Sequence, residues 1–215
     1  MVHRLMFSAN LNPNGRGNFM GIISRGFSGR SREHNPDLPP GQYLTEDFPV
    51  LSAGPTPDLD IADWKFTVQA ETGSTSWNWD ELHELGVEDV HTDIHCVTRW
   101  SKLATSWRGI PLDAIFDKVE TEREFVMEYS YGGYTTNVPL EDLLDGKAWI
   151  VSEFEGEPLD PEHGGPARLL VPHLYFWKSA KWIRGLIMQE NDEPGFWEQN
   201  GYNMYGDPWQ EQRYW

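Results

Sequence analysis

Apolar and polar residues alternate along much of this chain with a period of two, the pattern of half-buried β-strands. The clearest case is residues 64–69, where aromatic or branched side chains take every second position. Other strand-like segments cover residues 87–96, 125–129, 134–138, 149–151, 168–172 and 181–187. Strands therefore outnumber helices, and the chain is predicted to be an α+β domain dominated by a mixed sheet.

Helical patterns are few and short. Residues 111–119 carry apolar side chains on one face and a proline near the start, as expected for an amphipathic helix. Residues 75–85 are predicted to open with a Thr-Ser cap and to continue as a helix up to Gly86. A third short helix is predicted at 139–145, and residues 100–109 are predicted to form a loop anchored by two tryptophans.

The chain divides into an arm and a body. Residues 1–42 are rich in Asn, Gly, Ser and Arg and are predicted to be irregular. Residues 43–215 contain no clear linker and are predicted to form one domain. From residue 191 onward the sequence is aromatic and rich in turn formers, so we expect a tail that packs over the domain.

Composition favours a globular protein: 13% of the residues are aromatic, including 11 tryptophans. The net charge of −17 argues against a nucleic-acid binder, because phosphate neutralisation needs clustered cations. Residues 1–35 hold five arginines and one acid, which leaves 12 basic and 33 acidic residues of the totals of 17 and 34. The basic arm is either a tail on the acidic surface or a contact arm for a partner.

The sequence shows neither a secretory signal nor an apolar stretch long enough to span a membrane. The single cysteine is compatible with a reducing compartment. We therefore expect a cytoplasmic protein without membrane contact.

Cys96 is the only cysteine of the chain. One thiol cannot form an internal disulfide, a zinc cage or an iron–sulfur cluster. Three roles stay open: a buried small hydrophobe, a nucleophile paired with a histidine, or a thiolate ligand of a soft metal whose other ligands come from an organic cofactor. His95 is poorly placed to activate Cys96, because neighbours along a strand point to opposite faces.

Two further segments carry cations in an acidic protein. Residues 160–168 contain His163 and Arg168, both suited to an anion, and a Gly-Gly pair that would let the backbone approach a ligand closely. Residues 178–181, Lys-Ser-Ala-Lys, place two cations around small side chains. Solvated surface charge is the alternative interpretation of each segment.

These segments together resemble the sulfite oxidase-type molybdenum enzymes. The residues that carry the resemblance are DIHCVTRWS at 93–101 with WRGIPL at 107–112, HGGPARLLVP at 163–172, and YFWKSAKWI at 175–183. They occur in the family's order and cover about residues 43–190. The likeness is strongest to the short bacterial sulfite oxidase-like branch, which includes the catalytic subunit of the methionine sulfoxide reductase system.

The resemblance implies the strand-dominated, barrel-like molybdopterin-binding fold of that family. It implies a molybdopterin cofactor that holds molybdenum, with Cys96 as the one protein ligand of the metal. The residues that would contact the cofactor are Thr45, Asp47, Ser130, His163, Arg168, Ser179, Ala180 and Lys181. Arg99 is a candidate for holding substrate or cofactor near the metal, and a structural ion pair is its alternative role.

The implied activity is oxygen-atom transfer to or from a small sulfite- or sulfoxide-like substrate. The chain departs from true sulfite oxidases at residues 45–47, Thr-Glu-Asp, where the family has a cation that holds the anionic substrate. With no second cysteine for an iron–sulfur cluster, electrons are expected to pass through a separate partner. The alternatives are a cofactor-holding or partner-binding module without turnover, and a metal-free cysteine enzyme.

Overall fold

The structure is a computed structural model that describes residues 35–215. The predicted arm lies outside the described residues as far as residue 34, whereas residues 35–42 form turns and no helix. Gln42 is buried and Pro40 accepts a hydrogen bond from Arg213 near the C-terminus. The last residues of the predicted arm therefore contact the folded body.

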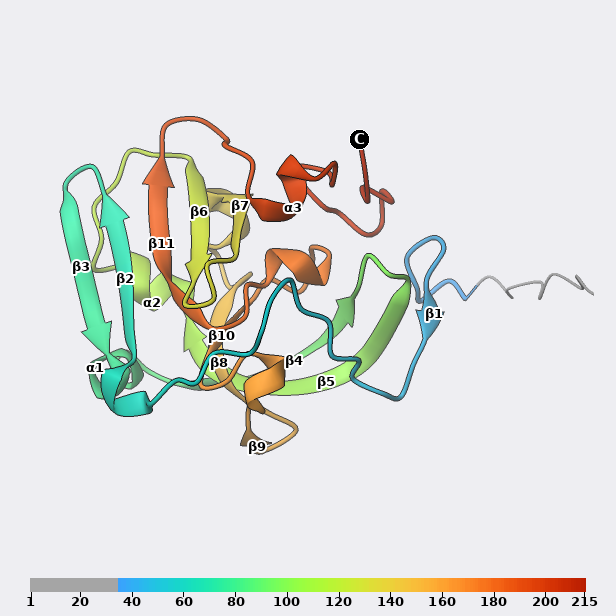
Figure 1. Cartoon of the computed structure of the whole chain (residues 1–215), viewed down its shortest axis with the longest axis horizontal. Coiled ribbons are helices and arrows are strands. Elements are labelled where there is room, and N and C mark those ends of the chain that lie inside the picture. The colour runs from blue at the N-terminus through green and yellow to red at the C-terminus, as the bar shows by residue number, and fades with distance from the viewer. Residues whose placement is uncertain (1–34) are drawn as a thin grey trace, which may run out of the picture. The chain divides into compact units, whose positions relative to one another are not determined.

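The described part of the chain is built around two mixed sheets (Figure 1). The first has the order β1-β5-β8-β10, with β4 also paired to β5 and β9 to β8; the second has the order β3-β2-β11-β6-β7. The strands are β1 Tyr43–Leu44, β2 Lys65–Ala70, β3 Gly73–Asn78, β4 Glu88–His95, β5 Trp100–Pro111, β6 Phe125–Ser130, β7 Thr135–Pro139, β8 Trp149–Phe154, β9 Glu157–Pro158, β10 Arg168–Leu170 and β11 Ile183–Gln189. The strand-dominated α+β prediction is confirmed, but among the described residues neither sheet closes into the barrel-like form expected.

Helices are short throughout the described residues. The α-helices are α1 Trp79–His83, α2 Leu112–Phe116 and α3 Phe196–Gln199, and the 3₁₀ turns are η1 Ile61–Asp63, η2 Leu140–Asp142, η3 Pro161–His163 and η4 Phe176–Lys178. The helices predicted at 111–119 and 139–145 thus shrink to α2 and η2. None of the described helices combines the length and the apolar character that a membrane span requires.

The helix predicted at 75–85 begins later than expected. Thr75 is paired with Val68 in the β2–β3 hairpin, so it cannot cap a helix. Asn78 is the true cap: its side-chain oxygen accepts from the backbone N–H of Glu81 at 3.0 Å, and the Glu81 carboxylate accepts from the backbone N–H of Asn78 at 2.9 Å. This reciprocal capping box ends the strand and starts α1 at the next residue.

The loop predicted at 100–109 was wrong, because these residues belong to the long strand β5. Trp100 and Trp107 are buried side chains of this strand and not loop anchors. Ala104 has a positive φ of 54°, and the pairing register shifts between Thr92 and Ile94 on β4. Such irregularities break the two-residue alternation along the sequence, which hides a strand from pattern analysis.

The apolar core has two parts. The larger one joins side chains from both sheets, including Phe66 of β2, Val126 of β6 and Ile150 of β8. The smaller one surrounds the residues that follow β4 and includes Cys96 and Trp177, with Trp197 and Tyr202 packed against it. The sole cysteine therefore lies in an aromatic part of the core.

Candidate functional site

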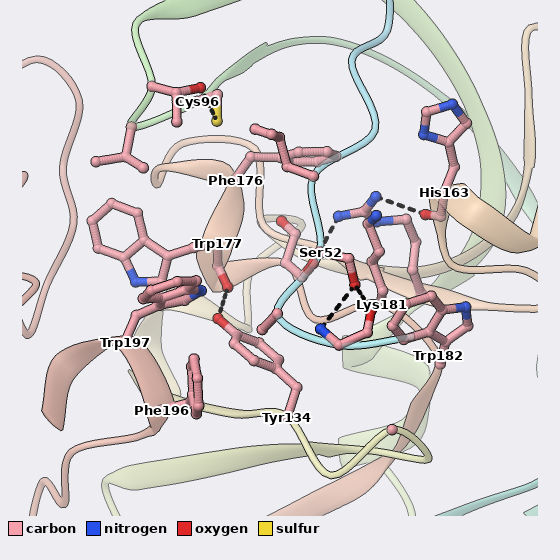
Figure 2. Close-up of a pocket in the computed structure, with 18 of the residues that line it drawn as sticks. Ser52, Cys96, Tyr134, His163, Phe176, Trp177, Lys181, Trp182, Phe196 and Trp197 are labelled. Atoms are coloured by element: carbon pink, nitrogen blue, oxygen red, sulfur yellow. Dashed lines mark hydrogen bonds between the residues drawn. The ribbon is translucent and has the colours of Figure 1, made fainter. Parts of the chain in front are cut away.

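A cavity of about 370 Å³ lies beside the smaller core cluster (Figure 2). Segments far apart in the sequence line it: residues 48–55, 96–100, 132–134, 163–182 and 196–202 contribute side chains. Its volume falls in the range of small-molecule sites. The three segments that the sequence analysis singled out all reach this cavity.

Cys96 lies at the cavity wall and is 7% exposed. Its sulfur accepts a hydrogen bond from the Thr98 hydroxyl at 3.1 Å. Burial raises the pKa of the Cys96 thiol, and the Thr98 hydrogen bond partly opposes that rise. A neighbouring cation or metal is therefore needed before the thiolate dominates at neutral pH.

The turn that carries Cys96 is held from outside the cavity. The side-chain amide of Gln42 donates to the Cys96 carbonyl at 3.0 Å, and the Arg213 guanidinium donates to the Val97 carbonyl at 2.6 Å. The N–H of Arg99 closes the turn on the Cys96 carbonyl at 2.9 Å. These contacts position the sulfur through the backbone of its own loop.

No histidine of the described residues is paired with Cys96. The His95 ring bonds the Ser101 hydroxyl at 2.8 Å through Nδ1 and does not line the cavity. The His163 ring does line the cavity but stacks on Phe48, with ring centroids 3.9 Å apart. A cysteine–histidine nucleophile would need a hydrogen bond between the two groups, and the described residues do not provide it.

A buried arginine forms the cationic part of the cavity. Arg168, which is 1% exposed, donates to the carbonyl oxygens of His163 at 2.8 Å and Ser179 at 2.7 Å. Burial lowers the pKa of Arg168 to about 9, so the guanidinium stays charged at neutral pH. No described carboxylate forms an ion pair with it. The buried Glu128 carboxyl acts on Arg168 electrostatically, but burial raises the pKa of Glu128 well above its usual range, so it offsets the guanidinium charge only in part. A buried charge that is only partly offset suits an anionic ligand.

Lys181 adds a second cation to the same cavity. Its ammonium donates to the Glu162 carbonyl at 2.6 Å, and within the described part of the chain it too lacks a carboxylate partner. Gly164 packs closely between the two cationic residues: a Cβ there would lie 3.0 Å from the Arg168 Cβ and 3.1 Å from the Lys181 Cβ. The missing side chain of Gly164 therefore lets Arg168 and Lys181 of the same chain pack against its backbone. We had expected the Gly-Gly pair to let the backbone approach a ligand.

The lowered pKa of Lys181 gives a pH prediction for the cofactor-free protein. Burial lowers this pKa from 10.5 to about 8, and Arg168 adds to the effect. At a pH between about 8 and 10.5, Lys181 is protonated more often in the unfolded chain than in the folded protein. Its contribution to the unfolding free energy therefore rises with pH. The unfolding free energy of the wild type, relative to Lys181→Met, is expected to increase between pH 7.5 and 10. Chemical denaturation measures it, with the exposed Lys118→Met as control. A constant difference would contradict the partly buried placement of Lys181.

Lys178 does not take part in an anion site, contrary to the prediction for residues 178–181. Its ammonium is fully buried and lies 2.7 Å from the Glu198 carboxylate of α3. It also donates to the carbonyl oxygens of Asn137 and Met204, both at 2.7 Å. The turn η4 directs Lys178 away from the cavity, so the segment supplies one cavity cation, Lys181.

The remaining predicted residues lie apart from the cavity lining. Thr45 follows β1, where its hydroxyl accepts from the backbone N–H of Asp47 at 3.1 Å, and neither residue lines the cavity. Arg99 is exposed at the turn after Cys96, with a positive φ of 80°. Ser130 and Ala180 are buried behind the lining residues. Ala180 donates its N–H to the Glu128 carboxylate at 3.2 Å, whereas the Ser130 hydroxyl has no partner among the described residues.

Aromatic rings form a large part of the cavity wall, which the sequence pattern does not predict. Figure 2 shows Tyr134, Phe176, Trp177, Phe196 and Trp197 around the cavity. The Tyr134 hydroxyl donates to the Trp177 carbonyl at 2.7 Å, and the Arg168 guanidinium lies 3.9 Å from the centroid of the Phe176 ring. Aromatic density in the third motif and in the tail was the available signal, but core packing explains such density equally well.

Comparison with known proteins agrees with this architecture. Residues 53–197 match the oxidoreductase molybdopterin binding domain family. The chain is 41% identical over 189 residues to the uncharacterized oxidoreductase YuiH of Bacillus subtilis, which covers 86% of this chain and 96% of that protein. It is 25% identical to a putative protein-methionine-sulfoxide reductase subunit of Azospira oryzae and 24% identical to human mitochondrial sulfite oxidase, each over 78% of this chain. It spans 66% and 38% of those two proteins.

The fold is similar to that of the sulfane dehydrogenase SoxCD from Paracoccus pantotrophus. The TM-score is 0.58 at 16% sequence identity, over 68% of this chain and 42% of that chain. From the family match and the identity to YuiH together, the chain belongs to the oxidoreductase molybdopterin binding domain family, is an oxidoreductase of the sulfite oxidase type, and uses molybdenum held by molybdopterin as its cofactor.

Proposed function

We propose that this oxidoreductase transfers an oxygen atom to or from a small sulfite- or sulfoxide-like substrate, and that the Cys96 thiolate binds the molybdenum. The observation that carries the proposal is that one cavity brings together the only thiol of the chain and two cations, Arg168 and Lys181, that form no ion pair with a described carboxylate. A metal bound through an anionic organic cofactor needs both features.

The residues present fit the cofactor. Arg168 and Lys181 supply positive charge for the pterin phosphate, and Phe176 offers an aromatic face beside that charge. Ser179 keeps Arg168 in place, because its carbonyl accepts from the guanidinium and its hydroxyl accepts from the backbone N–H of Val171 at 2.9 Å. The unpartnered Ser130 hydroxyl behind the wall is a further candidate contact.

The cofactor, when bound, supplies two-electron oxygen-atom chemistry, and the chain positions and shields it. Cys96 holds the metal end after loss of its thiol proton, and the Thr98 hydroxyl bond stabilises the resulting thiolate. The guanidinium of Arg168 and the ammonium of Lys181 orient the anionic end. The surrounding aromatic side chains exclude water, which strengthens these electrostatic contacts.

Three related predictions accompany this function. Electrons pass through a separate partner, since the chain offers no second cysteine for an iron–sulfur cluster. Residues 43–215 act as a single cofactor-binding domain, while the basic arm and the cytoplasmic location stay predictions. The roles of Thr45, Asp47 and Arg99 at the cofactor or substrate stay predictions as well, and their places outside the cavity lining do not support them.

The test is production of the chain in a host that makes molybdopterin and in one that does not. Protein from the first host should contain molybdenum and turn over sulfite with an artificial acceptor, or a sulfoxide with an artificial donor. Protein from the second should be folded and inactive. A metal-free cysteine enzyme predicts equal activity from both hosts, and a cofactor-holding module predicts bound molybdenum without turnover of either substrate class.

A further inference from the structure

We infer that Arg213 is a positioning residue of the metal site: it fixes the turn that carries Cys96 and places a positive charge behind the thiolate. The inference rests on the proposed function, in which Cys96 is the ligand of molybdenum. It extends the candidate site to the tail, residues 191–215, in which Arg213 is the only basic residue.

The side chain of Arg213 is buried against the cysteine turn. Only 8% of this side chain is exposed. Its guanidinium donates to the Val97 carbonyl at 2.6 Å and to the Pro40 carbonyl at 3.1 Å, and it lies 4.8 Å from the centroid of the Tyr175 ring. A long side chain loses much conformational freedom when it is fixed in this way, so the contacts that hold it must offset that loss.

Two segments far apart in the sequence hold the cysteine turn together. The Gln42 side-chain amide donates to the Cys96 carbonyl at 3.0 Å, and its oxygen accepts from the Arg213 guanidinium at 3.4 Å. Arg213 therefore contacts the turn directly at Val97 and indirectly through Gln42. The position of the cysteine backbone, and with it that of the sulfur, depends on this arginine.

The charge of Arg213 is only weakly neutralised by carboxylates. Glu211 lies 3.9 Å from the guanidinium and its side chain is 52% exposed, so solvent screens this pair. No other described carboxylate forms an ion pair with Arg213. Burial raises the pKa of the Cys96 thiol, and the charge of Arg213 acts on that thiol in the opposite direction. A buried cation with so little compensation favours a nearby anion, and a metal-bound thiolate is such an anion.

The arrangement gives Arg213 two separable effects on the metal site. Groups that support a metal ligand both orient the ligand and tune the metal. The hydrogen bonds of Arg213 keep the cysteine turn closed. Its positive charge stabilises the more electron-rich, reduced state of the metal and so raises the reduction potential. Loss of the bonds is therefore expected to loosen the turn, and loss of the charge to lower the potential.

Arg213→Gln in the full chain tests both effects. In the cofactor-free protein, the backbone amides of Cys96 and Arg99, which bond within the turn, should exchange hydrogen about tenfold faster than in the wild type, as expected for the loss of about one hydrogen bond. In the molybdenum-loaded protein, a redox titration followed by electron paramagnetic resonance should give a lower molybdenum midpoint potential. Turnover should fall by about 10–100-fold.

Matched variants separate position from charge. Arg213→Lys keeps the charge but lacks the forked donor group that reaches both carbonyl oxygens, so it should speed exchange and leave the potential near that of the wild type. Gln42→Met removes the bond to the Cys96 carbonyl, keeps Arg213, and should do the same. Arg184→Gln makes the same charge change on the exposed face of β11, outside the cavity lining, and should alter neither quantity.

The test does not depend on the folding of Arg213→Gln. Gln42→Glu places a carboxylate where the amide oxygen accepts from Arg213, so it neutralises the charge without removing the arginine. It should lower the midpoint potential, whereas Gln42→Met should not. Equal potentials in the wild type and in these charge variants would overturn the electrostatic role of Arg213. Unchanged exchange in Gln42→Met and Arg213→Lys would overturn its positioning role.

The outcomes also separate this inference from the proposed function. A wild-type protein that contains no molybdenum after production in a host that makes molybdopterin would contradict the proposed function. In that case faster exchange of the turn in the cofactor-free variants would still support positioning of Cys96 by Arg213, and unchanged exchange would overturn it.

Discussion

A Cys96→Ser protein is expected to fold as the wild type does and to transfer oxygen atoms at least about 100-fold more slowly. Mutation of residues that only support a metal ligand already lowers metal affinity or activity by about 10–100-fold. A serine hydroxyl does not ionise at neutral pH and is a poor ligand for a metal that prefers sulfur. The replacement is nearly isosteric, and Thr98 can still donate to the new oxygen. The unfolding free energy should therefore change by only about 1 kcal/mol or less.

Molybdenum analysis, turnover assays and chemical denaturation on the purified protein measure this prediction. His91→Gln is a suitable control, since His91 is exposed on β4, the strand that leads to Cys96, and does not line the cavity. It should keep the molybdenum content and rate of the wild type. Unchanged turnover in Cys96→Ser would show that the thiolate is not needed at the metal.

Lys178→Met is expected to destabilise the protein by about 3–5 kcal/mol, because it leaves the Glu198 carboxylate buried without its counter-charge. Both side chains are 0% exposed, and the atoms of the pair are 2.7 Å apart. The same Glu198 oxygen accepts from the Trp177 indole at 2.8 Å and from the Thr136 hydroxyl at 2.8 Å. The pair therefore joins α3, η4 and β7 behind the aromatic wall.

A double-mutant cycle separates the pair from the packing of each side chain. Glu198→Gln removes the charge but can keep hydrogen bonds to Trp177 and Thr136. Lys178→Met combined with Glu198→Gln should be much less destabilised than the sum of the two single changes. Additive effects, or a cost below about 1 kcal/mol for Lys178→Met, would contradict a desolvated ion pair.

The sequence predicts the main residues of the candidate site because each of them stands out within a short segment. Cys96 was singled out by counting thiols, and Arg168 and Lys181 by cations beside small residues in an acidic chain. Each side chain lines the same cavity. Lys178 resembled Lys181 in the sequence, but only the packing of α3 against η4 shows that Glu198 already pairs with it.

Features that depend on contacts between distant segments could not be read from the pattern. The sequence predicts a loop at residues 100–109 because irregular pairing breaks the alternation of strand β5. It predicts the start of α1 too early because Thr75 pairs across a hairpin. The aromatic wall combines residues near 134, 177 and 197, which are separated by long stretches of chain. The strand-dominated fold class is predicted correctly despite these errors, because the prediction depends on many segments together.

We propose that the thiolate of Cys96 holds the molybdenum in this cavity. X-ray absorption spectroscopy at the molybdenum edge counts the sulfur ligands of the metal directly in the loaded protein. Wild type is expected to show one more sulfur ligand than Cys96→Ser loaded in the same host, with the remaining sulfur ligands unchanged. Identical sulfur coordination in the two proteins would contradict binding of molybdenum by Cys96.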